Sequence, residues 1–113
     1  MWKQLSSITR RAVGTVVGLF TGLNRSNIIQ SDEGFSVEVL GLTGLRYTEG
    51  PKTLFIDSEL LAAGPFLLGM YSGSIKSWDP PYDNEIIDES KRAAIVDNVR
   101  RAFRSEGFEI DVI

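Results

Sequence analysis

Apolar and polar residues alternate through the middle of the chain, which is the pattern of half-buried β-strands. In residues 35–39 every second side chain is apolar, so one face of a strand would be buried and the other solvated. In residues 52–57 Leu54 and Ile56 share one face, and Phe55 takes the other. The pattern therefore predicts strands rather than helices in this region.

Short segments rich in turn-forming residues join six such runs in pairs, which predicts three β-hairpins. The turns lie at residues 31–34, 49–51 and 72–73. After residue 57 we expect one helical turn, ended by the Gly-Pro pair at 64–65, because serine and aspartate at a strand end commonly form turns. The six predicted strands are residues 27–30, 35–40, 44–48, 52–57, 65–71 and 74–78.

Residues 89–106 show the spacing of an amphipathic helix. Asp88 is a good N-cap, and Gly107 suits the position at which the helix stops. Residues 108–113 then alternate between apolar and acidic side chains, which predicts a last strand that pairs into the sheet. The apolar stripe of the helix consists of Ile95, Val96, Val99, Ala102 and Phe103.

The first part of the chain has apolar residues at helical spacing and a glycine at every fourth position from Gly14 to Gly22. Its uncharged run, residues 12–23, is shorter than the about 20 apolar residues that a membrane-spanning helix needs. We expect residues 3–23 to form an amphipathic helix that packs on the sheet. An interface with a partner or with a membrane surface fits the same pattern.

Together these elements predict an α+β fold. We expect an antiparallel meander sheet of about six to seven strands, a common sheet size, with an N-terminal helix and a C-terminal helix–strand unit. A chain of 113 residues fits one domain. Within this domain, 1–113, we distinguish an N-terminal helical segment, 1–24, from an α+β body, 26–113.

The composition excludes several kinds of enzyme, because the chain has neither cysteine nor histidine. Disulfides, thiolate metal sites and cysteine nucleophiles are thereby excluded, and the lack of cysteine fits a reducing cytoplasm. Without histidine the chain cannot hold a serine–histidine triad or an ordinary zinc hydrolase site. We therefore expect a protein that is not an enzyme.

The charge is divided unevenly along the sequence. Residues 1–25 carry four basic residues and no acidic one, whereas residues 26–113 carry eight basic and fifteen acidic residues, a balance of −7. Such a body repels nucleic acid and steers a basic partner toward itself. We expect no nucleic-acid partner and no membrane span.

Residues 78–89 combine aromatic and acidic side chains without any lysine or arginine. The spacing of the acids lacks the glycine-containing pattern of a calcium loop. A small meander also offers little room for the cleft of a carboxylate-based glycosidase. We therefore predict no metal site, no catalytic site and no cofactor. The acids are Asp79, Asp83, Glu85, Asp88 and Glu89.

The same segment fits two structural roles, a stiff turn before the helix and a surface that recognises a protein. The Pro-Pro pair at 80–81 restricts the backbone. Tryptophan and tyrosine are frequent anchors of protein interfaces, and acids suit a cationic partner. The alternative for the tryptophan is a place in the protein's own core. The predicted partner-binding residues are Trp78, Asp79, Tyr82, Asp83 and Glu85.

From about residue 45 to residue 113 the chain resembles small immunity proteins of bacterial polymorphic-toxin and contact-dependent growth-inhibition loci. The resemblance lies in Tyr-Thr-Glu-Gly at 47–50, Ile-Asp-Ser-Glu-Leu at 56–60, Trp-Asp-Pro-Pro at 78–81 and the closing helix–strand pair. Residues 1–24 lie outside it.

This resemblance implies a cytoplasmic, non-enzymatic protein that binds and neutralises the C-terminal domain of one cognate toxin. Such toxins are often nucleases with basic clefts, which an acidic inhibitor would suit. We expect the protein to be a monomer or a weak dimer. The alternative function is a generic acidic interaction module without a toxin.

Overall fold

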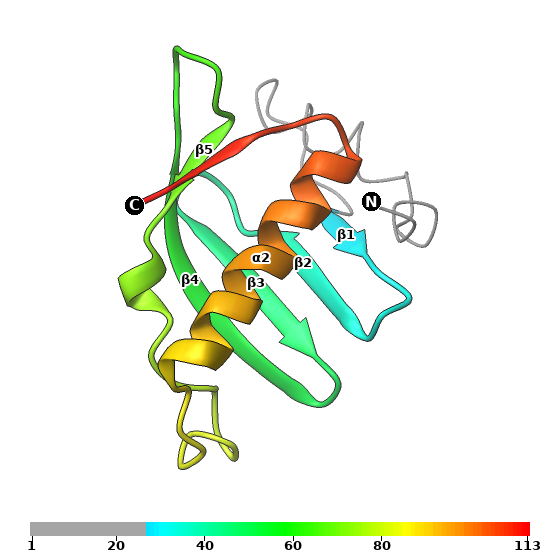
Figure 1. The fold of residues 1–113 in the computed structure, drawn as a ribbon, viewed down its shortest axis with the longest axis vertical. Helices are drawn as coiled ribbons and strands as arrows, with labels where there is room; N and C mark the ends of the chain where they lie inside the picture. The colour runs from blue at the N-terminus through cyan, green and yellow to red at the C-terminus, as the bar shows by residue number, and fades with distance from the viewer. Residues whose placement is uncertain (1–26) are drawn as a thin grey trace.

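The computed structural model describes residues 27–113. In this part of the chain a six-stranded sheet is crossed on one face by a long helix, α2 (Figure 1). The α+β class is thus confirmed for the described residues. The helix predicted over residues 3–23 lies outside them.

The first four strands form an antiparallel meander in which spatial order follows chain order. Gly34 and Gly50 have φ of 97° and 61°, so the turns that follow the first and third strands use glycine where other residues would be strained. The first two predicted hairpins are confirmed. The strands are β1 (Ile28–Gln30), β2 (Phe35–Val39), β3 (Gly44–Glu49) and β4 (Lys52–Leu60).

The end of β4 differs from the prediction of a helical turn after residue 57. β4 continues to Leu60, because residues 58–60 find an antiparallel partner in β5 (Leu68–Met70). The hydrogen bonds of this pairing keep the backbone extended for three more residues. Turn-forming side chains alone therefore did not decide the conformation.

The predicted strand at 74–78 is wrong, and with it the third hairpin. The chain forms a short 3-10 helix, η2 (Ser72–Ser74), and then runs along β4, where Ser77 makes an isolated bridge with Ile86. Ile75 and Trp78 are both buried although they are three residues apart. In a strand they would point to opposite faces, so the irregular path is the one that buries both.

Helix α2 (Glu89–Ser105) begins at the predicted residue and ends one residue before the predicted end. The Asp88 carboxylate accepts a hydrogen bond of 2.8 Å from the backbone N–H of Lys91, and Gly107 has φ of 89° just after the last turn. Four members of the predicted stripe are fully buried, and Val96 is partly buried. The helix packs on the sheet through these residues.

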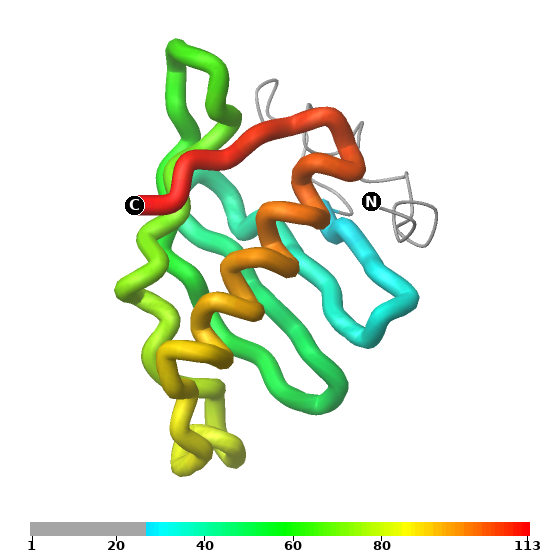
Figure 2. Tube along the Cα trace, in the orientation of Figure 1, coloured from blue at the N-terminus to red at the C-terminus, as the bar shows by residue number. Residues whose placement is uncertain are grey.

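The last strand, β6 (Ile110–Val112), joins the sheet as expected but pairs with β5 in parallel. Figure 2 shows why: the chain leaves β5, passes along α2 over the sheet and returns beside β5 in the same direction. A helical crossover of this kind gives parallel neighbours, whereas a tight turn gives antiparallel ones. The sheet is therefore an antiparallel meander with one parallel pair at its end.

The main core lies between the sheet and α2. Leu45, Leu54 and Ile56 from the strands face Ile95 and Phe103 from the helix, and all five are nearly inaccessible to solvent. No helix within residues 27–113 combines the length and the apolar character needed to cross a membrane.

Candidate protein-binding site

The predicted binding residues lie in or beside one loop, residues 78–87, which we call the corner loop. Trp78 and Ile87 are both buried, with exposed fractions of 3% and 5%, so each end of the loop is fixed in the core. The bridge between Ser77 and Ile86 brings the two ends together. The two ends of the corner loop are therefore held close together by the core.

Trp78 belongs to the protein's own core, which is the alternative that its sequence left open. Its ring stacks on Tyr47 at a centroid distance of 6.3 Å. The ammonium groups of Lys52 and Lys91 lie 5.6 and 6.0 Å from the Trp78 ring centroid, within cation–π range. The indole therefore supports the loop from beneath and is not presented to a partner.

At Asp79 the corner loop passes from the side of β4 that faces the core to the opposite side. Its Oδ2 accepts hydrogen bonds from Thr53 Oγ1 at 2.7 Å and from Arg46 Nη1 at 3.2 Å. Its backbone N–H donates to the Thr53 carbonyl oxygen at 2.8 Å. These three bonds fasten the first residues of the corner loop to β3 and β4.

In the outer part of the loop, Tyr82 and Glu85 contact the rest of the protein, whereas Asp83 is exposed. Tyr82 is half-buried against the core, and Lys52 Nζ lies 5.7 Å from its ring centroid. The same ammonium group forms an ion pair of 2.5 Å with Glu85 Oε1. Asp83 is exposed, and no ion pair with it occurs within residues 27–113.

Ile86 is the residue that sequence reasoning missed. Its side chain is 89% exposed, next to the acids of the corner loop. The signal was present in the pair Ile86-Ile87: because Ile87 is buried, its neighbour in an extended segment must point outward. The loop thus offers an apolar contact, although not the predicted one.

A partly buried polar cluster lies beside the tryptophan and links the sheet to the helix. Tyr47 Oη donates to Glu49 Oε1 at 2.7 Å and accepts from Asn98 Nδ2 at 2.8 Å. Burial, together with the hydrogen bond to Glu49, raises the pKa of Tyr47 far above its ordinary value. The phenol therefore stays protonated and acts as a structural hydrogen-bond donor.

Glu49 also binds the helix directly, through an ion pair of 2.5 Å between its Oε2 and Lys91 Nζ. Burial acts to raise the pKa of this carboxyl, but the hydrogen bonds from Lys91 and Tyr47 outweigh it, so the net pKa is lowered. The cluster is an ion pair with a neutral phenol, an arrangement that fastens α2 to β3.

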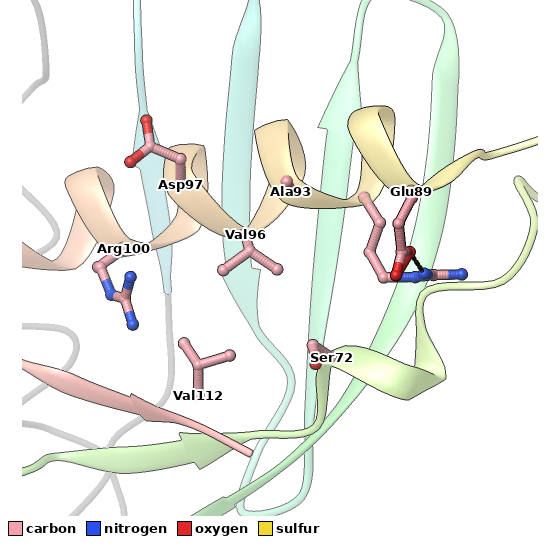
Figure 3. A pocket seen from close by; sticks show the side chains of 8 residues that line it. Ser72, Glu89, Ala93, Val96, Asp97, Arg100 and Val112 are labelled. Atoms are coloured by element: carbon pink, nitrogen blue, oxygen red, sulfur yellow. Dashed lines mark hydrogen bonds and ion pairs between the residues drawn. The ribbon is translucent and has the colours of Figure 1, made fainter.

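A shallow groove of about 450 Å³ runs between α2 and β6. Figure 3 shows Val96 and Val112 facing each other across it, with Arg100 at one end. At the other end Arg92 is held by an ion pair with Glu89 and by a bond to the Ile75 carbonyl oxygen. The lining therefore offers apolar contact and charge, but no nucleophile set against a base.

The described residues also lack any group of three or more acidic side chains placed to hold a metal ion.

Comparison with known proteins identifies the family. The family model described as Immunity protein 74 matches residues 40–113, which include β3, β4, β5, α2 and β6. Neither the curated proteins nor the solved structures give a match. The match spans the corner loop and well over half of the sequence, and it confirms the resemblance seen in the sequence motifs. The chain belongs to the Immunity protein 74 family.

Proposed function

We propose that this protein neutralises the toxin domain encoded beside it by forming a one-to-one complex in the cytoplasm, and that this domain is a nuclease. The observation that carries the proposal is the balance of −7 over residues 26–113 in a member of an immunity protein family. A nuclease binds a polyanion and therefore presents a basic cleft. An acidic inhibitor is complementary to such a cleft.

The corner loop contributes to this complex through Asp79, Asp83 and Glu85, with Tyr82 beside them. Its fixed base supports the proposal, because a loop that is already ordered loses little conformational entropy on binding. Trp78 contributes indirectly, by stabilising the fold beneath the loop, since its ring is covered by Tyr47, Lys52 and Lys91. Ile86 adds an exposed apolar side chain at the same loop.

The test combines the full chain with the adjoining toxin domain. Calorimetry should give a stoichiometry near one, and the inhibitor should abolish cleavage of nucleic acid by the toxin. In the double variant Asp83→Lys/Glu85→Lys, association should slow about tenfold or more, because the loop's charge toward the toxin is reversed. Asp79 is left intact in this variant, since it holds Arg46 and Thr53.

The matched control is Asp32→Lys/Asp97→Lys, which changes the charge equally in the β1–β2 turn and on α2. It should associate more nearly like the parent. If both double variants slow association to the same extent, the effect comes from the net charge of the protein and not from a binding site at the corner loop. If the parent binds no toxin domain, the proposed function itself fails.

A further inference from the structure

The two sides of the sheet differ sharply in charge. Five of the eight basic residues in 26–113 lie on α2, on the helix side. The strands contain two, Arg46 and Lys52, and Lys52 lies over the Trp78 ring on the inner side. The eighth, Lys76, is exposed in the segment that runs along β4. Arg46 points away from the helix, where it is bound to Asp79. The side of β2, β3 and β4 turned away from α2, which we call the outer face, is therefore short of positive charge.

Three acidic residues of the strands, Glu38, Asp57 and Glu59, lie on the outer face, whereas Glu49 of β3 is bound to Lys91 of α2. Glu38 pairs across the sheet with Arg46, and Arg46 in turn lies opposite Phe55. Asp57 and Glu59 follow Phe55 at every second position of β4, so they share its side. Within residues 27–113 none of these three acids forms an ion pair, although Glu59 accepts a hydrogen bond from the Tyr71 hydroxyl. Their charge is thus available to a partner.

Phe55 occupies the middle of this face and is unusually accessible for an aromatic residue on a central strand, with 48% of its surface exposed. Its ring lies over Gly44 of β3: a Cβ added at Gly44 would be 2.3 Å from the ring's Cε1. The glycine therefore leaves room for the ring to lie against the sheet. One side of the ring is held and the other is open.

Two more exposed apolar side chains lie in or beside the connection between β2 and β3. Leu40, 38% exposed, stands beside Gly44, to which it is bonded through its backbone N–H. Leu42, 63% exposed, lies in the following turn, where its carbonyl oxygen accepts a bond from Leu60 N–H at the end of β4. An apolar centre with unpaired acids around it has the composition of a protein interface rather than of a solvated sheet face.

From this arrangement we infer that the outer face is the main docking surface for the toxin domain, with Phe55 as its apolar anchor and Glu38, Asp57 and Glu59 as its acidic border. The partner is a folded protein surface with a basic patch around an apolar recess. The outer face continues into the corner loop through Asp79, whose carboxylate is bound to Arg46 and Thr53. This inference rests on the proposed function and names the surface that performs it.

The first experiment is hydroxyl-radical footprinting of the full chain, free and in complex with the toxin domain. Phe55 should be oxidised in the free protein and protected in the complex. Protection already in the free protein would mean that the chain's own remaining residues cover the ring, and the inference would be overturned. Equal oxidation in both states would place the toxin elsewhere and overturn it as well.

The second experiment measures affinity for Phe55→Ala. Loss of a central aromatic anchor should weaken the complex about 30-fold or more, mainly through faster dissociation. The matched control is Phe66→Ala, a partly buried phenylalanine in the β4–β5 connection. The melting temperature of both variants is measured first, because Phe55 also packs on Gly44 and its loss could destabilise the fold. A Phe55→Ala variant that is folded and binds at parental affinity overturns the inference.

The border is tested separately with Asp57→Asn/Glu59→Gln, which removes two charges and retains the side-chain shapes. Association should slow about three- to tenfold, and dissociation should change little. An unchanged association rate would show that Asp57 and Glu59 are not part of the docking surface. The two proposals fail differently: if no toxin complex forms with the parental chain, the proposed function and this inference both fall, whereas a complex insensitive at Phe55 removes only the docking surface.

Discussion

At the scale of single residues, the position of Trp78 changes what its neighbours can do. A tryptophan among acids and prolines reads as an exposed anchor, yet its indole closes the core beneath the corner loop. The sequence indicates the aromatic residue but not its direction, because that depends on Ile75 three residues earlier, which also has to be buried. Phe55 shows the converse: its outward direction follows from alternation, whereas the glycine beneath it becomes visible only with the strand register.

Replacing Trp78 with alanine should therefore destabilise the fold rather than the complex alone. Removal of a large buried aromatic side chain costs about 3–5 kcal/mol, a large share of the about 5–15 kcal/mol that stabilises a domain. Thermal or urea unfolding monitored by circular dichroism measures the loss. Ile86→Ala is the control in the same loop, and it should unfold like the parent because Ile86 is exposed. A Trp78→Ala protein with parental stability would contradict the assignment of the indole to the core.

At the scale of elements, the link between β3 and α2 is polar as well as apolar. Tyr47 and Glu49 on the strand are bound to Asn98 and Lys91 on the helix. The helix and its cap could be predicted from sequence, since Asp88, the apolar stripe and Gly107 all act locally. The polar link could not, because its partners are 42 and 51 residues apart. The parallel pairing of β6 escaped prediction for the same reason.

This link predicts a dependence of stability on pH. The folded-state pKa of Glu49 lies below its ordinary value of 4.5, so the ionised carboxylate favours the folded state. Its contribution is fully present above about pH 4.5 and is lost as the pH falls through the lowered pKa. Urea unfolding from pH 7 to pH 3 should show a smaller acid-induced loss in Glu49→Gln than in the parent.

The control for this experiment is Glu109→Gln, which removes an exposed carboxylate that is paired with Arg104 outside the link. Exposed pairs contribute little to stability, so this variant should follow the parental pH profile. Identical profiles for the parent and for Glu49→Gln would show that the carboxylate does not stabilise the contact between strand and helix.

At the scale of the whole molecule, charge is separated between two sides. Arginine and lysine gather on α2, and unpaired acids lie on the outer face of the sheet. Net charge and its division along the chain could be read from composition. The separation of charge in space could not be read from composition, because it arises when alternate residues of β2 and β4 point to opposite sides of the sheet. A modest net charge of −3 thus hides a strongly acidic side.

Association with the toxin domain should therefore depend steeply on ionic strength. The screening length falls from about 10 Å at 0.1 M salt to about 3 Å at 1 M, so steering from the acidic side is lost while close contacts persist. Stopped-flow measurements should show the association rate falling with added salt and the dissociation rate changing much less. Equal sensitivity of both rates would argue against steering by the outer face and the corner loop.

The irregular segment that replaces the predicted strand at 74–78 has a further consequence. Tyr71 and Asp79 donate backbone hydrogen bonds to carbonyl oxygens of β4, and Ser74 Oγ accepts one from the N–H of Asp57. The rim of the longest strand is thereby closed to strands of other molecules, which is how β-sheet proteins resist aggregation. A protein that acts as the proposed one-to-one inhibitor has to be present in at least as many copies as its target. This covering removes one place at which copies could add strand to strand, beside residues 53–57 of β4, and leaves the broad outer face next to it for recognition.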